Sequence, residues 1–550
     1  MAISEFLSLS PIMACSKLFS GDLPELINEV IQYFRYNHKT LHSCILVNRL
    51  WCRLAIPLLW EDPFSIKSPK NYHFIEIYLH YLNNDDKAKL NEYVIHNELL
   101  PSNTLFNYPR FIQRLDTYKV WFSIEKWVAT VGTSTTRVKH IFRSLFLIFI
   151  ENEVSLHSFK IKITPTCGDI IELILQNPNF ICNIIYLQLD FDMMITDNTK
   201  RFLIFIHSNC NSISSLDFLF PSMASSVYYH SIVEKSLLQI IKSQEKLRKI
   251  SFRFIEEYPI YHYLSSLKNP NCLNTLNTIM FHHIDFKNID ILSEVFNQLH
   301  VLESIHIINC YSLDSKFIQQ IINITKPFKL KSLFLDDKIS ELILEPLIQK
   351  FGCYLENFGV NHNISQKLLQ LIIKYCSKIN YLGPIRFNHK NNKNVYLLFR
   401  LIKNITQNLN YLTIEASNIS YNYINYGSSS IILQNLGQIL PFKLKYLNLS
   451  LTINTSDLEI FLKNSQSTFI KKLLIKYIKK EENEDIFPYI KEYIMKTNRV
   501  KYLAIVENFN EKYEDLFSQK DKVEEFQLYS NIKVMYYSDL VNNTFYSIKR

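Results

Sequence analysis

The sequence predicts an α/β protein in which a small three-helix module and a helical connecting region precede a long array of strand–helix repeats. Apolar residues near the start of the chain recur at helical spacing. From Leu156 onward a different apolar pattern returns at a nearly constant interval. At 550 residues the chain exceeds what one compact core accommodates, whereas an array of repeats grows in one dimension.

The repeating pattern is an apolar residue, two further residues, a second apolar residue, one residue and a third apolar residue. Thirteen copies begin between Leu156 and Val500, which makes the mean interval about 29 residues. In one weaker copy, Ile379-Leu382, Pro384 stands at the third position. The complete copies are Leu156-Phe159-Ile161, Ile184-Leu187-Leu189, Ile213-Leu216-Phe218, Leu247-Ile250-Phe252, Leu276-Ile279-Phe281, Leu302-Ile305-Ile307, Leu330-Leu333-Leu335, Leu355-Phe358-Val360, Leu409-Leu412-Ile414, Leu444-Leu447-Leu449, Ile470-Leu473-Ile475 and Val500-Leu503-Ile505.

Helical patterns lie between these triplets, as in DLEIFLKNSQSTF at residues 457–469. We therefore expect the strands to line a concave side and the helices a convex side. An all-helical solenoid of the HEAT type is the alternative. The triplets at 302–307 and 444–449 favour strands, because apolar residues at alternate positions are typical of a half-buried strand.

This periodicity resembles the leucine-rich repeat family in an irregular form, over roughly 350 residues. The family's Asn or Cys, three residues after the third apolar position, is present in this chain as Cys310 but is missing from most copies. The resemblance implies a solenoid over residues 151–550 that ends in a C-terminal cap, and the missing Asn or Cys argues against regular curvature.

Residues 21–64 carry the pattern of three short helices. Leu26, Ile27, Val30 and Phe34 repeat at steps of three and four residues, and Pro24 stands where a first-turn proline is tolerated. Thr40 is expected to cap the second helix and Asn48 the third, which Pro57 should end. So small a module bears more apolar surface than it covers alone. Residues 1–20 are expected to be flexible and residues 65–150 to form a helical connecting region.

The stretch LPELINEVIQYF, together with CILVNR at 44–49 and Trp51, is similar to the F-box, a three-helix motif. In that family the Leu-Pro end and the apolar faces dock onto a Skp-family adaptor, which joins a cullin-RING ubiquitin ligase. The resemblance therefore implies adaptor contact, or support of the contact surface, for six residues: Leu23, Pro24, Leu26, Ile27, Val47 and Trp51.

An F-box followed by leucine-rich repeats matches a known class of substrate receptor. The resemblance implies that the front of the chain binds the Skp-family adaptor, and through it a cullin, while the array binds an unknown protein substrate. A leucine-rich repeat scaffold that works outside a ubiquitin ligase is the alternative.

The sequence displays no catalytic or cofactor-binding motif. Its 8 glycines form no phosphate-binding loop, and no G-x-S-x-G, H-E-x-x-H or kinase signature is present. The 10 cysteines make no C-x-x-C pair of the kind that zinc ribbons use. We expect no enzyme activity, no metal and no cofactor.

Charge and hydropathy argue against nucleic acid and membranes as partners. The net charge of +9 is mild for this length. Lys471-Lys472 and Lys479-Lys480 are followed by Glu481, Glu482, Glu484 and Asp485, which predicts a solvated loop. The longest apolar run, residues 145–150, is far shorter than the roughly 20 residues of a membrane span. The N-terminal stretch lacks signal-peptide features, and we expect the protein in the cytoplasm, the nucleus or both.

Tyrosine recurs at one position of the repeats, directly before the second apolar residue. Side chains alternate along a strand, so this position is expected to face the concave side. Tyrosine combines a large rigid surface with a polar tip, which suits a binding surface. After Tyr186 in an early copy, the remaining four are the predicted substrate-binding residues: Tyr381, Tyr411, Tyr446 and Tyr502.

Overall fold

The computed structural model describes residues 24–35, 37–66, 69, 71–83, 87, 104–131, 137–191, 196–220, 227–253, 260–325, 328–335, 341–387, 392–416, 427–478, 485–509 and 512–541. The expected flexible segment 1–20 and the predicted adaptor contact Leu23 lie outside these ranges. The chain divides into two compact units. The first comprises Met1–Ile250 and Asn269–Thr275, and the second comprises Ser251–Lys268 and Leu276–Arg550.

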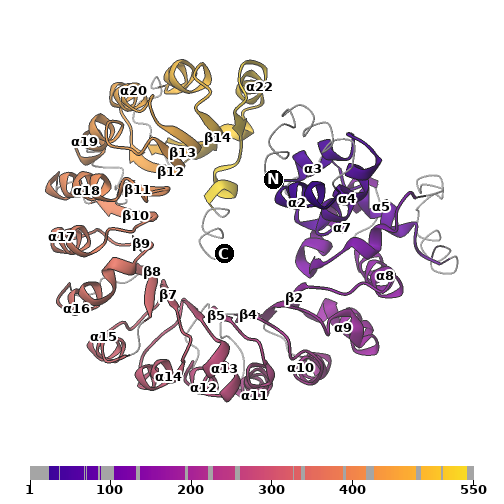
Figure 1. Ribbon diagram of the computed structural model, residues 1–550. Helices are drawn as coiled ribbons and strands as arrows, with labels where there is room; N and C mark the ends of the chain where they lie inside the picture. Colours follow the sequence, from indigo (N-terminus) through magenta and orange to yellow (C-terminus); the bar gives the residue numbers. More distant parts are fainter. Residues whose placement is uncertain are drawn as a thin grey trace, which may run out of the picture. The chain divides into compact units, whose positions relative to one another are not determined.

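The first unit begins with helices and continues as alternating strands and helices (Figure 1). Its helices are α2 (Pro24–Tyr33), α3 (His38–Cys44), α4 (Arg49–Leu59), α5 (Phe74–Leu79), α7 (Thr117–Val131), α8 (Val138–Glu151), α9 (Gly168–Gln176), α10 (Asp197–Asn209), α11 (Val227–Ser243) and α13 (Pro270–Thr275). Short 3₁₀ turns are η1 (Pro63–Ser65), η3 (Tyr108–Phe111), η5 (Pro165–Cys167) and η6 (Pro178–Phe180). Its strands are β1 (Arg114–Asp116), β2 (Ser158–Ile163), β3 (Tyr186–Phe191) and β4 (Ser215–Leu219), and β5 (Lys249–Arg253) spans the division between the units.

The second unit alternates strands and helices almost throughout (Figure 1). Its helices are α12 (Tyr261–Ser266), α14 (Leu292–Gln298), α15 (Ser315–Ile322), α16 (Glu341–Phe351), α17 (Gln366–Tyr375), α18 (Asn392–Ile405), α19 (Gly427–Leu436), α20 (Thr455–Asn464), α21 (Phe487–Ile490) and α22 (Lys520–Tyr529), with short turns η7 (Gly352–Tyr354), η8 (Lys491–Met495) and η9 (Leu516–Ser518). Its strands are β6 (Thr278–His282), β7 (Ser304–Ile308), β8 (Lys329–Leu335), β9 (Asn357–Val360), β10 (Tyr381–Phe387), β11 (Tyr411–Ala416), β12 (Lys443–Thr452), β13 (Phe469–Ile478), β14 (Val500–Phe509), β15 (Lys512–Asp515) and β16 (Lys533–Val534).

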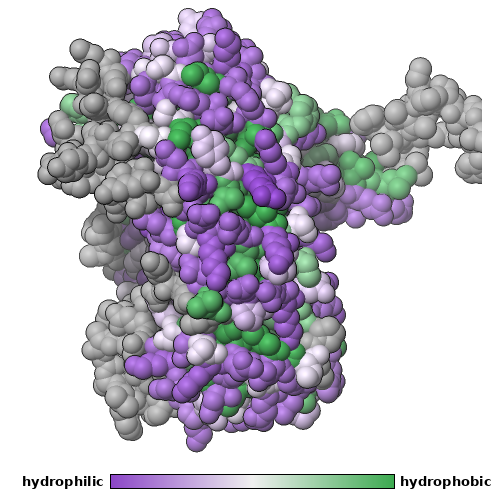
Figure 2. Space-filling view, turned by 90° about the vertical axis from the view of Figure 1, so that its left-hand side faces the viewer, coloured by the Kyte–Doolittle hydropathy of each residue, from purple (hydrophilic) through white to green (hydrophobic). Residues whose placement is uncertain are grey.

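The strands follow one another in an open sheet in the order of the chain, with β16 beside β14. Neighbours in each unit pair in parallel, except that β15 runs antiparallel to β14. The mixed α/β class is therefore confirmed, and an all-helical HEAT-type solenoid is excluded. In the second unit the strands line the inner side and helices α14 to α20 cover the outer side (Figure 1). Hydrophilic side chains predominate on the outward surface that Figure 2 shows, with apolar groups between them.

The apolar triplets occupy equivalent positions in neighbouring strands. Leu412 of β11 pairs with Leu447 of β12, which pairs with Leu473 of β13, which pairs with Leu503 of β14. All four side chains are buried. Each repeat therefore adds one layer to a continuous core between strands and helices, as stacked repeats require.

In the weaker triplet, Ile385 takes the third apolar position, one residue later than the spacing predicts. The register between β10 and β11 shifts after Leu382, so that Ile385 pairs with Ile414. Gly383 has a φ of +130°, and a Cβ there would lie 2.3 Å from the Thr413 carbonyl oxygen. A glycine therefore lets the strand bulge past Pro384 and return its next apolar side chain to the core.

The strands also depart from the even triplet register between β7 and β8. Ile307 of β7, rather than Ile305, pairs with Leu333 of β8. The pairing shifts by one residue between Ile305 and His306, and from His306 onward the offset of two residues from the triplet register keeps paired side chains on the same face, because the strand period is two. The sheet also begins earlier than residue 151, since β1 pairs with β2 from within the expected helical connecting region.

The three N-terminal helices form with caps that partly differ from expectation. Asn37, not Thr40, caps α3: its side chain accepts from the Thr40 N–H at 3.2 Å. Asn48 caps α4 as predicted, accepting from the Trp51 N–H at 2.9 Å. Pro57 does not end α4, which continues to Leu59. A proline close to the helix end removes only one backbone hydrogen bond, and the buried Leu58 side chain holds the last turn in the core.

Candidate functional site

Helices α2, α3 and α4 enclose their own small core. It contains Ile27, Ile31, Leu41, Cys44, Trp51, Ala55 and Leu58. Ile27 and Ile31 stand one helical turn apart on α2, so they form the single face that this helix buries. The remaining apolar residues of α2 are therefore not needed for this core.

Those remaining residues form an apolar stripe on the solvent side of α2. Leu26, Val30 and Tyr33 follow one another at steps of four and three residues, which aligns them along one face of the helix. The exposed fraction is 48% for Leu26, 39% for Val30 and 87% for Tyr33. Leu46 and Val47, in the turn between α3 and α4, are also exposed. We call these five residues the apolar surface of the module.

The predicted adaptor contacts divide into exposed and buried residues. Pro24, Leu26 and Val47 are exposed at the surface. Ile27 is fully buried and Trp51 is 9% exposed, both within the core of the module. These two residues therefore support the surface and do not form part of it.

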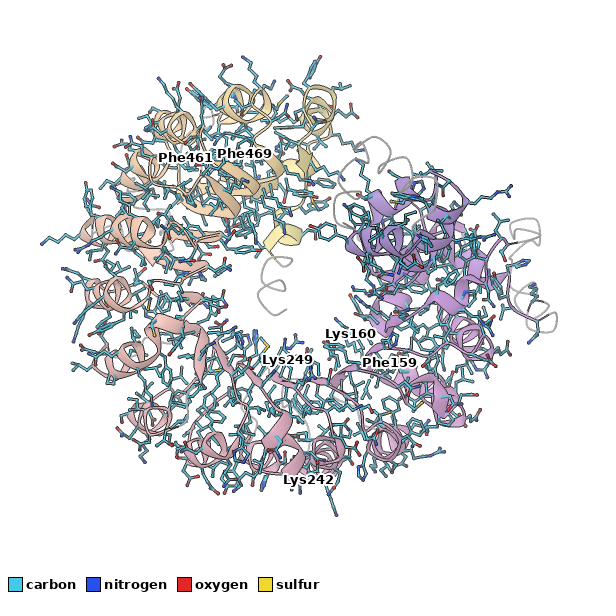
Figure 3. The ribbon with its side chains drawn as sticks, viewed as in Figure 1. Phe159, Lys160, Lys242, Lys249, Phe461 and Phe469 are labelled. Atoms are coloured by element: carbon cyan, nitrogen blue, oxygen red, sulfur yellow. The ribbon has the colours of Figure 1, made fainter. Side chains whose placement is uncertain are left out.

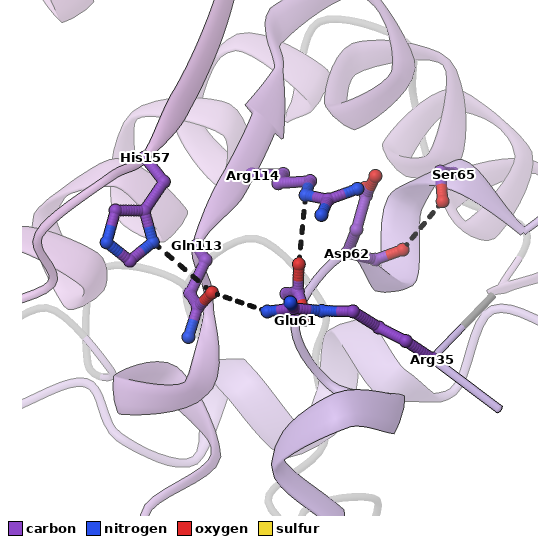
Figure 4. Close-up of polar contacts among 7 residues, drawn as sticks. All are labelled: Arg35, Glu61, Asp62, Ser65, Gln113, Arg114 and His157. Carbon is purple, nitrogen blue, oxygen red and sulfur yellow. Dashed lines mark hydrogen bonds and ion pairs between the residues drawn. The ribbon is translucent and has the colours of Figure 1, made fainter. Parts of the chain in front are cut away.

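A buried carboxylate ties the module to the first strand (Figure 4). The side chain of Glu61, 5% exposed, lies between two arginines. Its Oε1 is 2.9 Å from Nε of Arg114, and its Oε2 pairs with Nε of Arg35. Arg35 also donates to the Gln113 side chain at 3.2 Å, and the N–H groups of Gln113 and Arg114 donate to the Glu61 carbonyl. Side-chain and backbone bonds thus fix the loop after α4 against β1.

Aromatic packing reinforces this attachment. The buried ring of Tyr78 on α5 contacts Trp60 and Phe64 from the segment after α4, and Phe149 from α8, with centroid separations of 5.4, 6.0 and 5.3 Å. Desolvation raises the pKa of the neighbouring Asp62 carboxyl above its usual range, and the charge of Lys119 partly opposes this shift. The ring contacts therefore attach the end of the module to α5 and α8 within the first unit.

The predicted tyrosine row forms in the second unit. Tyr381 pairs with Tyr411, and Tyr411 pairs with Tyr446. The ring centroids of these neighbours lie 5.9 and 6.3 Å apart. In the next two strands Lys472 and then Tyr502 follow at the same position.

The C-terminal segment covers part of this row. Tyr537 donates from its hydroxyl to Asn448 Oδ1 at 2.8 Å. Leu540 is 2% exposed and packs in one cluster with Tyr446, Leu474 and Ala504. A segment beyond the last repeat therefore occupies the inner face of β12 to β14.

Two of the four tyrosines are buried, contrary to the expectation that all four face a target: Tyr446 packs with Leu540 of the C-terminal segment, whereas Tyr381 packs with Met280, Ile308 and Phe334. The exposed fraction is 4% for Tyr381 and 2% for Tyr446, whereas Tyr411 and Tyr502 are half-buried. Burial raises the pKa of Tyr381 to about 12 and raises that of Tyr446 further. The alternation of side chains along each strand was predicted correctly, but the cover that the C-terminal segment places over Tyr446 was not.

The inner face of the first unit is polar. Phe159 points to the helices and Lys160 to the inner side of β2 (Figure 3). The Lys160 ammonium lies 5.6 Å from the ring centroid of Tyr186. The Tyr186 hydroxyl is 3.1 Å from Gln188 Oε1 and 3.3 Å from Asp217 Oδ2. This tyrosine belongs to a network of polar and charged groups, unlike the apolar row of the second unit.

Sequence reasoning missed several residues of the Glu61 junction, of the cover over the tyrosine row and of the starts of strands β12 to β14. Glu61 and Tyr537 act through partners far away in the chain, and no local pattern marks them. Lys445, Lys471 and Lys501 do share a local signal, since each directly follows the first apolar residue of its triplet. Lys471 and Lys472 lie in strand β13 and not in a loop, whereas residues 479–484 lie outside the described residues.

Neither a membrane-spanning helix nor a metal site is found among the described residues. No helix among them is long and apolar enough to cross a membrane. No group of three or more His, Cys, Asp and Glu side chains in those same ranges is placed to hold a metal ion.

No protein-family model matches the sequence, and no curated protein matches it.

Proposed function

We propose that this protein is the substrate-recognition subunit of an SCF-type ubiquitin ligase. In this role the three-helix module docks onto the Skp-family adaptor, which brings the cullin, and the repeat array binds the target protein. The chain itself carries no catalysis. Ubiquitin transfer belongs to the other subunits, and the protein positions its target.

The observation that carries the proposal is the apolar surface of the module. Its members are surplus to the core, which Ile27, Ile31 and Trp51 fill from the opposite side. Soluble proteins rarely gather exposed apolar residues on so small a region unless a partner covers them. The Glu61 junction adds support, because it attaches the module to β1, the first strand of the repeat array, within the first unit.

The target-binding role rests on the array. Parallel strands stacked on one side offer an extended inner surface of the kind that repeat proteins use for binding. Of the predicted substrate contacts, Tyr411 and Tyr502 keep accessible area. Tyr381 and Tyr446 would be reached only if the C-terminal segment and the neighbouring groups moved away.

The test is co-purification of the full chain with the adaptor and the cullin. Leu26→Lys with Val47→Lys places charge on the apolar surface without disturbing the core, because both side chains are about half exposed. We expect this variant to lose at least about tenfold in adaptor affinity. Ile185→Lys with Ile204→Lys, equally exposed on the first unit, is the matched control and should bind normally.

Two outcomes would redirect the proposal. If wild-type protein captures neither adaptor nor cullin, the ligase role is wrong. If it captures the adaptor without a cullin, a leucine-rich repeat scaffold that works outside a ubiquitin ligase becomes the better description.

A further inference from the structure

A row of lysines crosses three neighbouring strands of the second unit where these strands begin. Lys445 of β12, Lys471 of β13 and Lys501 of β14 are all exposed. Each follows the first apolar residue of its triplet, and those residues are paired in register as Leu444↔Ile470 and Ile470↔Val500. Adjacent strands lie about 5 Å apart, so the three lysines start from backbone positions spaced by about that distance.

These lysines lack acidic partners among the described residues. With the exposed Lys443 beside them they form what we call the basic edge, and none of the four makes an ion pair within the described ranges. The segments that lead into the three strands, residues 437–442, 465–468 and 496–499, contain no Asp or Glu. The ammonium groups of Lys445 and Lys501 lie 5.9 and 5.6 Å from the ring centroids of Tyr411 and Tyr502.

Acidic side chains of these strands stand at their other end. Glu507 follows Lys501 by six residues along β14, which corresponds to about 20 Å. Glu507 accepts a hydrogen bond from Tyr477 and neighbours Glu514 across the β14–β15 pair. At this separation water and salt screen most of the attraction. The positive charge of the basic edge is therefore uncompensated within the second unit's described strands.

Two exposed phenylalanines adjoin the basic edge. Phe442 directly precedes Lys443, and Phe469 pairs with Lys443 across the strands. Their rings meet edge to face with centroids 5.6 Å apart, and they are 63% and 55% exposed. By contrast Phe461, on helix α20, is fully buried (Figure 3). Large aromatic side chains that remain exposed beside a charged row mark an interaction surface.

We propose that the basic edge and the two phenylalanines bind an acidic segment of the target, with an apolar side chain seated on the Phe442–Phe469 pair. Carboxylates complement the unpaired ammonium groups, and the aromatic pair supplies an anchor. A nucleic acid fits less well, because a row only three strands wide neutralises few phosphates. This inference rests on the proposed function, since it names the class of target that the array receives.

The probe is a fluorescein-labelled peptide of glutamates around a central leucine, measured by anisotropy with the full chain. The basic-edge variant, Lys445→Glu with Lys471→Glu and Lys501→Glu, should weaken binding at least about tenfold. Phe442→Ser with Phe469→Ser should weaken binding several-fold while leaving its salt dependence unchanged. A peptide with glutamine in place of glutamate should not bind. Equal thermal unfolding of each variant and the wild type shows that the fold is intact.

The control makes the same change of charge on helices α11 and α15, at Lys242 and Lys316, and in one loop, at Lys287. All three are exposed, and Figure 3 shows Lys242 on the outer side of helix α11. This variant should bind the peptide like the wild type. Equal binding by the basic-edge variant, or no binding by wild-type protein, overturns the inference. Tighter binding of single-stranded DNA or of phosphatidylserine vesicles that is lost in the same variant also overturns it.

Failure of this inference and failure of the proposed function give different results. Adaptor capture depends on the module and should be normal in the basic-edge variant. If peptide binding requires the lysines while wild-type protein captures no adaptor, the binding surface stands and the ligase role falls. If adaptor capture succeeds and the peptide does not bind, the acidic target class alone is wrong.

Discussion

Replacing Glu61 with glutamine tests whether a buried charge holds the three-helix module to the array. Glutamine keeps the size of the side chain but removes the charge. The amide oxygen can accept a hydrogen bond from only one of the two arginines. The amide NH₂ group would face the N–H donors of the other arginine and could not bond to them. Arg35 and Arg114, 32% and 29% exposed, would then share no carboxylate at this site.

The expected cost follows from this burial. Breaking a fully buried ion pair costs about 3–5 kcal/mol. Because about a third of each arginine side chain reaches solvent, we expect a smaller loss of about 2–3 kcal/mol. The solvent-exposed pair Arg110–Glu153 is the control, and Glu153→Gln should cost less than about 0.5 kcal/mol.

Hydrogen exchange of backbone amides in α2 to α4 and in β1 measures this loss, because it reports the free energy of local opening. Glu61→Gln should speed exchange in these elements, and β12 to β14 should be unchanged. If Glu61→Gln and Glu153→Gln exchange alike, the junction contributes no more than a surface ion pair and the reasoning is refuted.

Three further predictions concern the second unit. Leu540→Ala should cost about 2–4 kcal/mol and speed amide exchange at the start of β14, because a buried leucine is lost from the C-terminal segment; unchanged exchange would contradict its packing. Burial raises the pKa of Tyr381 to about 12. The buried, neutral tyrosine therefore contributes fully to stability below about pH 10. This contribution, about 3 kcal/mol, is lost as the pH rises through 12. Alkaline titration followed by circular dichroism should therefore show a smaller loss for Tyr381→Phe, and equal losses would count against the shift. Burial also raises the Cys376 pKa to about 12, so a thiol reagent at pH 8 should label the exposed Cys353 and spare Cys376 until the protein unfolds; equal labelling rates would refute this.

Much of the architecture was predictable because it depends on local chemistry that repeats. Each triplet places apolar side chains on one face of a strand, and thirteen copies leave little choice but to stack. Asn48 was recognisable as a cap because capping is decided within a few residues. The positions of Pro24, Leu26 and Val47 at the surface also follow from helical and turn geometry.

Other features depended on residues far apart in the chain. The position of Ile385 in the core follows from a bulge that the neighbouring strand β11 selects. The three residues Arg35, Glu61 and Arg114 meet only after the module has packed against β1.

The sequence by itself determined the alternating strands and helices, the apolar side of each repeat and the separate helical module, since the periodicity of side chains decides which face is buried. Only the tertiary structure decided which surfaces remain open to partners. Tyr446 occupies the predicted face of its strand, yet Leu540, 94 positions later in the chain, buries it. Lys445, Lys471 and Lys501 become one surface through parallel pairing alone. Exposure depends on what packs above a side chain, and that is a property of the folded chain as a whole.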